Sequence, residues 1–187
     1  MANLTYTINI AGLERKLPLF KVADDLSIAA FILFGDVAIT KAAAAELLKR
    51  APEYDVMITA EAKSIPLIYE MAAQAGQNNY IIARKAVKVY MENVLSVPVK
   101  SITTANPQML YLDGEEAAAM KGKRVLIVDD VISTGESLQA LERLVTAAGG
   151  EIAGRMAVLA EGDAKDRDDI IFLEPLPLFH GDGSVIE

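Results

Sequence analysis

The sequence predicts an α/β fold in which a central, mostly parallel sheet is flanked by helices. Two strand–helix–strand patterns carry this prediction. In the first, residues 54–59 and 80–83 have the apolar character of buried strands, with a helical segment between them. In the second, four consecutive apolar residues at 125–128 precede a helical pattern and a further strand at 155–160. Because parallel strands need a crossover, usually a helix, both patterns indicate a parallel sheet.

The two ends of the chain differ from this rhythm and predict a small hood beside the sheet. Residues 4–10 alternate as a strand does, and a turn at Ala11 and Gly12 leads into a second strand. Residues 24–34 are expected to form a short helix capped by Asp24 or Asp25. The expected division is one domain, 1–187, with a core at 41–160 and a hood from 1–40 and 161–187.

Within the core, several boundaries follow from local signals. Thr40 is expected to cap a helix over 41–50, and Ser64 is expected to open the next helix. Strands are expected at 99–103 and 108–112, as a hairpin with a mobile tip. The segment after residue 161 is expected to begin as an exposed, highly charged loop and to end as an irregular tail.

Composition excludes several classes of function. The chain has 187 residues, of which 52% are hydrophobic, and it carries a net charge of −8 and no cysteine. The absence of cysteine excludes disulfides, thiolate nucleophiles and zinc–cysteine sites. An acidic surface repels nucleic acid, and no apolar run is long enough to span a bilayer. With no visible signal peptide, we expect a cytoplasmic protein without nucleic-acid or membrane partners.

A pattern typical of phosphate binding follows the apolar run at 125–128. Two carboxylates stand where that strand is expected to end, and a loop of small hydroxyl residues leads into a helix. Backbone N–H groups and the helix dipole bind phosphate there, and a glycine allows close approach. The carboxylates suit the hydroxyls of an attached sugar, or Mg²⁺. The predicted sugar-phosphate site comprises Asp129, Asp130, Ser133, Thr134, Gly135, Glu136 and Ser137. The competing interpretation is an ordinary turn capped by its acids.

This arrangement resembles the signature of the type I phosphoribosyltransferases, which has four apolar residues, two acids and a Thr-Gly loop. The resemblance implies the type I phosphoribosyltransferase-like fold, with phosphoribosyl pyrophosphate and a nucleobase as substrates. It also implies Mg²⁺ as cofactor, held through the substrate and by Asp129 or Asp130, and a homodimer. Both acids would hold the ribose hydroxyls, while the loop at 133–137 would hold the 5′-phosphate.

Two further segments extend the resemblance to the pyrophosphate half of the substrate. The run Glu61, Ala62, Lys63 and Ser64 is similar to the pyrophosphate loop of adenine and xanthine phosphoribosyltransferases. Lys63 matches the basic position of the adenine enzymes, whereas Ser64 replaces the usual glycine. The run Arg84, Lys85 and Lys88 resembles the Arg-Lys-x-x-Lys pattern that holds pyrophosphate in the family, often across a dimer interface.

The resemblance also implies base contacts and a mechanism. Leu33 and Phe34 are similar to the Val-Phe pair of adenine phosphoribosyltransferases, whose phenylalanine contacts the base, although Gly35 replaces the arginine that follows. The implied reaction needs no protein nucleophile. Positioning and charge stabilisation would come from Asp129, Asp130, Lys63 and Arg84 as catalytic residues, and from a flexible loop within 90–110 that excludes water.

The expected activity is purine phosphoribosyl transfer in purine salvage, with adenine as the favoured acceptor. A xanthine, hypoxanthine–guanine or orotate enzyme stays open, because base contacts through backbone groups leave no residue signature. A non-catalytic regulator that senses phosphoribosyl pyrophosphate is the alternative from another class. Glu92 is a candidate general acid that no motif anchors, and His180 is expected to be a surface or hood residue.

Overall fold

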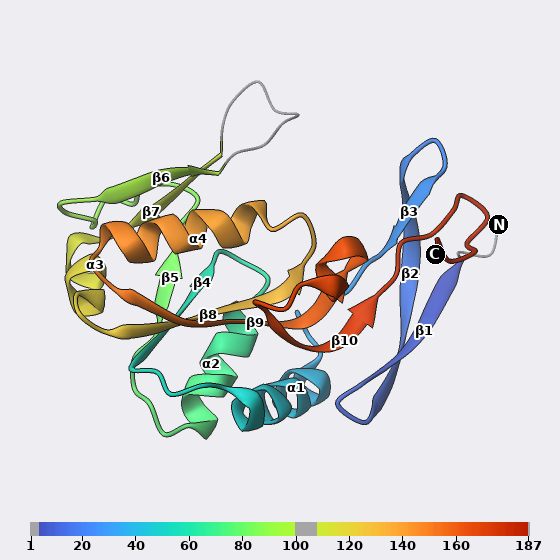
Figure 1. Ribbon diagram of the computed structural model, residues 1–187, viewed down its shortest axis with the longest axis horizontal. Coiled ribbons are helices and arrows are strands. Elements are labelled where there is room, and N and C mark those ends of the chain that lie inside the picture. The colour runs from blue at the N-terminus through green and yellow to red at the C-terminus, as the bar shows by residue number, and fades with distance from the viewer. Residues whose placement is uncertain (1–3, 100–107, 187) are drawn as a thin grey trace.

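The computed structural model describes residues 4–99 and 108–186, whose strands form three sheets (Figure 1). The strands are β1 Thr5–Ile10, β2 Leu13–Ala23, β3 Leu26–Ala29, β4 Val56–Ala60, β5 Ile81–Ala83, β6 Leu95–Val99, β7 Gln108–Leu112, β8 Arg124–Ile132, β9 Glu151–Glu161 and β10 Ile171–Leu176. The helices are α1 Val37–Arg50, α2 Ile65–Gln74, α3 Gly114–Met120 and α4 Glu136–Ala147, and a 3₁₀ helix, Gly162–Asp166, follows β9.

The central sheet has the order β10-β9-β8-β4-β5, and all its neighbouring strands are parallel, as predicted. Side chains of β8 alternate between two buried layers. Leu126 and Val128 pack with residues of α1 and α2, whereas Val125 and Ile127 pack with residues of α4. The helices therefore cover opposite faces of the sheet (Figure 1). Burial on both faces explains why this strand is an uninterrupted apolar run.

The strand β8 is longer than predicted, and this places the two acids inside the strand instead of at its end. Its pairing with β4 stops at Ile127, whereas its pairing with β9 continues to Ile132. The second half of β8 therefore has a paired neighbour on one side only. Asp129 and Asp130 lie in this half, next to the segment that follows β4.

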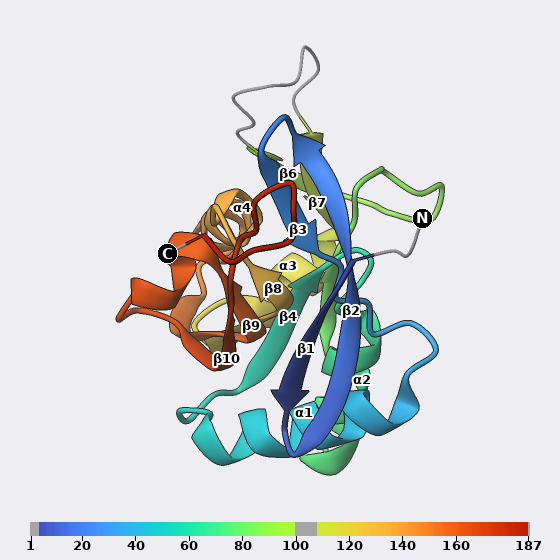
Figure 2. The same ribbon diagram turned by 90° about the vertical axis from the view of Figure 1, so that its right-hand side faces the viewer.

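The N-terminal segment forms the predicted hairpin, but the helix predicted at 24–34 is wrong. Residues 24 and 25 form a turn, and β3 pairs antiparallel with β2. The physical reason is the alternating burial in β3, which suits a strand better than a helix. Ser27 of β3 also exchanges two backbone hydrogen bonds with Phe179, at 2.7 and 3.0 Å. The C-terminal segment thus lies against the N-terminal sheet (Figure 2).

The helix α1 begins at Val37, earlier than the predicted start at 41, because Asp36 caps it instead of Thr40. Asp36 Oδ1 accepts a hydrogen bond from the backbone N–H of Ile39 at 3.1 Å. Arg15 of β2 donates two further bonds to the same carboxylate, at 2.6 and 3.0 Å. Asp36 therefore both starts the helix and fixes it to the N-terminal sheet.

The hairpin of β6 and β7 differs from the prediction in its first strand. The structure places β6 at Leu95–Val99, before the expected 99–103, and β7 where it was expected. Residues 100–107, which include the rest of the expected strand and part of the expected flexible loop, lie outside the described residues. In the described part of the chain, no helix has the length and apolar character needed to cross a membrane.

Replacing Asp36 with alanine is expected to lower the free energy of unfolding by about 1 kcal/mol at pH 7, since it removes a helix cap and an ion pair. The hydrogen bonds from Arg15 keep the pKa of Asp36 below its ordinary value. Its contribution is therefore present above the unfolded pKa, near 4, and is lost as the pH falls through the lower folded pKa. Urea unfolding at pH 7 and pH 3 measures this. Asp24→Ala, at a fully exposed turn position, is the control, and equal stability of the two variants would contradict the prediction.

Candidate active site

A cavity of about 450 Å³ opens at the carboxyl ends of the central strands β4, β8 and β9. This is the edge at which open parallel sheets bind ligands. Three segments form most of its wall: 28–32 from the end of β3 onward, 60–64 after β4, and 129–138 from β8 into α4. Lys85 and Glu161 complete its charged lining. The cavity therefore brings together most of the segments that the sequence singled out.

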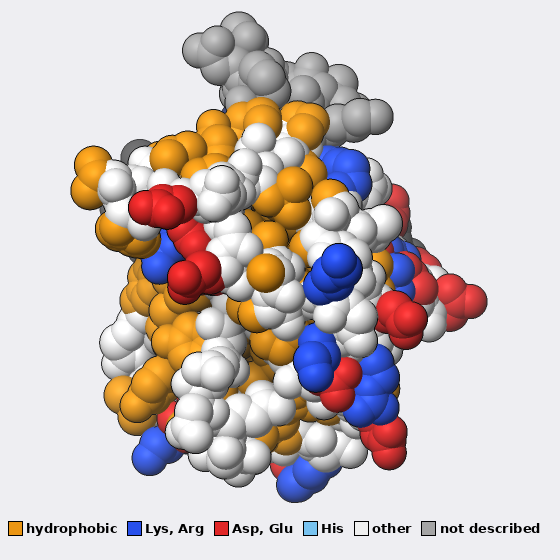
Figure 3. All heavy atoms as spheres, turned by 90° about the vertical axis from the view of Figure 1, so that its left-hand side faces the viewer, with side chains coloured by type: hydrophobic (Ala, Val, Ile, Leu, Met, Phe, Trp, Pro, Cys, Tyr) orange, Lys and Arg blue, Asp and Glu red, His pale blue; other side chains and the backbone are white. Residues whose placement is uncertain are grey.

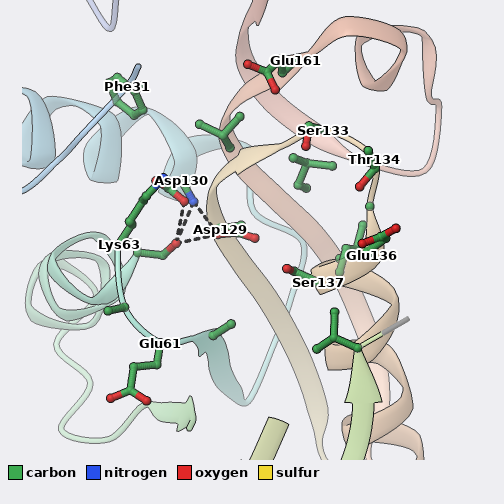
Figure 4. Close-up of a pocket in the computed structure, with 18 of the residues that line it drawn as sticks. Phe31, Glu61, Lys63, Asp129, Asp130, Ser133, Thr134, Glu136, Ser137 and Glu161 are labelled. Atoms are coloured by element: carbon green, nitrogen blue, oxygen red, sulfur yellow. Dashed lines mark hydrogen bonds between the residues drawn. The ribbon is translucent and has the colours of Figure 1, made fainter. Parts of the chain in front are cut away.

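The loop between β8 and α4 has the geometry of an anion site. Gly135 is the N-cap of α4 and has φ of +79°, a conformation that other residues rarely adopt. No side chain caps this helix among the described residues, so its first N–H groups stay available to a ligand. Ser133, Thr134 and Ser137 are exposed along the same wall (Figure 4). Backbone amides, hydroxyls and the helix dipole all favour a phosphate here.

The two acids of β8 are joined to the loop after β4 through one hydroxyl group. Ser64 Oγ donates to Asp129 Oδ1 at 2.6 Å and lies 3.2 Å from Asp130 Oδ1 (Figure 4). The same oxygen accepts a bond from the backbone N–H of Asp130 at 2.9 Å. Ser64 is 1% exposed and precedes α2 without capping it through its side chain. Its hydroxyl thus serves the acids and not the helix.

The acid pair is held in an environment that disfavours two negative charges. Burial, and secondly the neighbouring charge of Asp130, raises the pKa of Asp129 to about 7. Asp130 is 6% exposed, and its Oδ2 has no hydrogen-bond partner among the described residues. Hydroxyl donors or a cation would satisfy these oxygens.

Mg²⁺ fits this donor set as a shared ion. The described residues contain no cluster of three or more histidines or carboxylates that could hold a metal. Mg²⁺ commonly takes only one or two carboxylates and completes its shell with substrate phosphates and water. Asp129 and Asp130, with one unpartnered oxygen, would supply that share.

The loop after β4 is braced against the end of β5. The backbone N–H of Glu61 donates to the carbonyl oxygen of Ala83 at 2.9 Å. Glu61 Oε2 accepts a bond from the backbone N–H of Lys85 at 2.9 Å, and its Oε1 lies 3.9 Å from Arg84 Nη1. The peptide bond from Glu61 to Ala62 is cis. Glu61 therefore positions two basic segments relative to each other.

The structure separates the predicted basic residues into two groups. Lys63 and Lys85 line the cavity. Arg84 does not, because its backbone pairs with Tyr111 and it lines a neighbouring cavity of about 550 Å³ that also contains Glu92. Lys88 lines neither cavity. Within one chain, Arg84 and Lys88 therefore do not line the space that Lys63 and Lys85 line, and their contact with pyrophosphate stays a prediction.

The predicted base-contacting pair is also displaced. Leu33 is 1% exposed and belongs to the core, and Phe34 is 54% exposed; neither lines the cavity. Phe31 and Ile32 line it instead. The cavity wall ends at Ile32, so the sequence match selected a phenylalanine two residues beyond it.

Sequence reasoning missed Glu161, which it assigned to an exposed loop. The strand β9 runs through Glu161, which is half-buried and lines the cavity beside the end of β8. The available signal was its position directly after a buried strand of a parallel sheet, where ligand-binding residues gather. His180, expected in the hood, forms a 2.9 Å contact with Asp25 there.

Replacing Asp129 with asparagine is expected to stabilise the protein at pH 8 by about 1–2 kcal/mol, because it removes a buried charge beside Asp130. The folded pKa of Asp129, about 7, exceeds the unfolded value. The wild type therefore loses stability as the pH rises from about 4 through 7, and the difference between the two proteins should vanish near pH 4. Urea unfolding at both pH values measures this, with exposed Asp163→Asn as control. A variant less stable than wild type at pH 8 would refute it.

Comparison with known proteins agrees with this geometry. Residues 36–179, more than half of the chain, match the phosphoribosyl transferase domain family. The chain is 37% identical over 111 residues to a hypoxanthine/guanine phosphoribosyltransferase of Methanotorris igneus; the match covers 59% of this chain and 56% of that protein. The chain thus spans little more than half the length of this curated relative.

Solved structures share the fold. An adenine phosphoribosyltransferase from Thermoanaerobacter pseudethanolicus has a TM-score of 0.64 at 23% identity, covering 76% of this chain and 84% of that one. One from Trypanosoma brucei, in complex with AMP, pyrophosphate and ribose-5-phosphate, has a TM-score of 0.62 at 17% identity, covering 75% and 65%. The expected resemblance and fold class are confirmed, and the chain belongs to the phosphoribosyl transferase domain family.

Proposed function

We propose that this chain is a purine phosphoribosyltransferase, which transfers the 5-phosphoribosyl group from phosphoribosyl pyrophosphate to a purine and releases pyrophosphate. The observation that carries the proposal is the single cavity that joins the 133–137 phosphate loop, the acid pair of β8 and the 60–64 loop. Each of these segments suits one part of that substrate. The cavity would therefore accept a ligand with an anionic group at each end and hydroxyl groups between them.

The substrate would lie along the cavity in a fixed direction. Its 5′-phosphate would bind the amides and hydroxyls of 133–137, and its ribose hydroxyls would donate to Asp129 and Asp130. Its pyrophosphate would meet the 60–64 loop, where Lys63 and Lys85 face the cavity. A solved structure with the same fold, from Trypanosoma brucei, contains ribose-5-phosphate and pyrophosphate together with AMP.

The reaction would break the bond between C1 of the ribose and the pyrophosphate oxygen as a purine nitrogen forms a bond to C1. Lys63 and Lys85 would stabilise the charge that develops on the leaving group, and Asp129 and Asp130 would hold the ribose in line. Arg84 would act on the leaving group indirectly, as a neighbour of Glu61 that positions the loop. Mg²⁺, when bound, would add further charge neutralisation.

The base would bind at the end of the cavity that Phe31 and Ile32 line, because an apolar wall favours a planar ring. The motif-based expectation was adenine. The curated relatives that share 33–37% identity are instead named hypoxanthine/guanine phosphoribosyltransferases. Likeness to adenine enzymes below 25% identity speaks for the fold only. We therefore favour a 6-oxopurine as acceptor over adenine.

A homodimer is the assembly that we propose, formed through the segment after β5. Val87, Val89 and Tyr90 are 53%, 107% and 66% exposed, close in sequence to Lys85 and Lys88. Exposed apolar side chains also gather on one half of the face that bears α3 (Figure 3). Several exposed apolar side chains close together favour association with another molecule.

Light scattering should return about twice the 20.1 kDa mass of the chain. Val89→Asp should shift the protein towards monomer, because it places a charge in the contact. The matched control is Val37→Asp, at a 67% exposed position on α1. A monomeric wild type at micromolar concentration would contradict the proposed assembly.

The proposed activity is tested by the double variant Asp129→Asn with Asp130→Asn. Wild type should form nucleotide from phosphoribosyl pyrophosphate, Mg²⁺ and a purine, and should bind phosphoribosyl pyrophosphate in calorimetry. The double variant should bind it at least roughly tenfold more weakly, since two charge-assisted contacts are lost. Its control, Asp163→Asn with Asp166→Asn, removes the same two charges from exposed positions. Unchanged affinity in the first variant would reject the site assignment.

A further inference from the structure

One acidic side chain of the cavity has no role in the phosphate and ribose subsites. Glu161 ends β9, and its half-buried carboxylate faces the cavity. Burial raises its pKa, an effect that the positive charge of Lys63 opposes. Among residues 4–99 and 108–186, no group donates a hydrogen bond to the Glu161 carboxylate. The carboxylate is thus an acceptor with an accessible side and no partner in the part of the chain that the structure describes.

The other acids of the cavity wall all have such a partner or a local role. These are Glu61, Asp129, Asp130 and Glu136. The first three accept hydrogen bonds from a backbone amide or from the Ser64 hydroxyl. Glu136 is the first residue of α4, where an acid is stabilised by the helix dipole. Glu161 differs from them because neither of its carboxylate oxygens has a hydrogen-bond partner among the described residues, and it does not begin an α-helix.

Glu161 lies on the side of the cavity where Phe31 lies. Figure 4 shows Glu161 between Phe31 and Ser133, the first residue of the 133–137 loop, with Glu136 and Ser137 farther along that loop. Its carboxylate oxygens are turned towards the side on which Phe31 lies (Figure 4). A planar ligand that packs on Phe31 would present its edge to this carboxylate.

We infer that Glu161 is a specificity-determining residue that reads the donor edge of a 6-oxopurine, with guanine preferred; this inference rests on the proposed function. A carboxylate accepts two parallel hydrogen bonds from the N1–H and the 2-amino group of guanine. Hypoxanthine has the N1–H alone and makes one of these bonds. Adenine presents an unprotonated N1, whose lone pair faces the carboxylate, and xanthine presents an oxygen at C2. Adenine therefore leaves both carboxylate oxygens unpaired, and xanthine sets its C2 oxygen against one of them, which a polar site rejects strongly.

The inference is tested by kcat/KM for guanine, hypoxanthine, adenine and xanthine at pH 8, with phosphoribosyl pyrophosphate and Mg²⁺. Wild type should prefer guanine, then hypoxanthine. In Glu161→Gln the ratio of guanine to adenine should fall at least roughly tenfold, because the amide keeps one acceptor and adds a donor that suits adenine N1. Glu161→Ala should lose the preference for guanine without that gain for adenine. Both variants should bind phosphoribosyl pyrophosphate as wild type does.

Asp163→Asn is the matched control, since it removes a charge from an exposed position in the adjoining 3₁₀ helix. It should leave every ratio unchanged. If wild type is active but the ratios do not move in Glu161→Gln, or kcat/KM falls by the same factor for every base, the role of Glu161 alone would be overturned. A wild type that forms no nucleotide and does not bind phosphoribosyl pyrophosphate would overturn the proposed function and the inference with it.

Discussion

The hydroxyl of Ser64 is the contact on which the architecture of the site depends. It lies between two carboxylates of β8 and holds the loop that follows β4 against them, at 2.6 Å from Asp129 and 3.2 Å from Asp130. The pairing of β4 with β8 ends before this level, so side chains must join the two segments. A glycine at this position would leave the acids without their partner. The departure from the family pattern is therefore a structural link between the loop after β4 and the acid pair of β8.

The electrostatics of the molecule oppose its proposed substrate at long range and favour it locally. With 26 acidic and 18 basic side chains, the chain as a whole repels anions. At the cavity, the N-terminus of α4 and two lysines provide positive potential. The two neighbouring acids of β8 oppose it, because burial makes their negative charges unfavourable. Bound hydroxyls or Mg²⁺ would make these charges less unfavourable. Affinity would thus depend on groups within hydrogen-bond distance and change little with net charge.

The sequence predicted the elements that carry strong periodic signals and missed those decided by tertiary contacts. The parallel core follows from apolar runs buried on both faces, and the phosphate loop from glycine and hydroxyl residues before a helix. Residues 26–29 form a strand in place of the predicted helix because β2 and Phe179 offer hydrogen bonds that local propensity cannot reveal. Phe31 lines the cavity where Phe34 was expected, and Glu161 lines it although a loop was expected there. Side-chain direction depends on the tertiary contacts that anchor each segment, which local sequence does not specify.

A crystal structure with ribose 5-phosphate, pyrophosphate and Mg²⁺ tests the central claim, that one cavity holds both halves of the substrate on two loops joined by Ser64. The account predicts the sugar phosphate on residues 133–137, its hydroxyls on Asp129 and Asp130, and pyrophosphate on the loop at 60–64. Pyrophosphate bound instead in the neighbouring cavity beside Arg84 and Glu116, apart from the sugar phosphate, would contradict it.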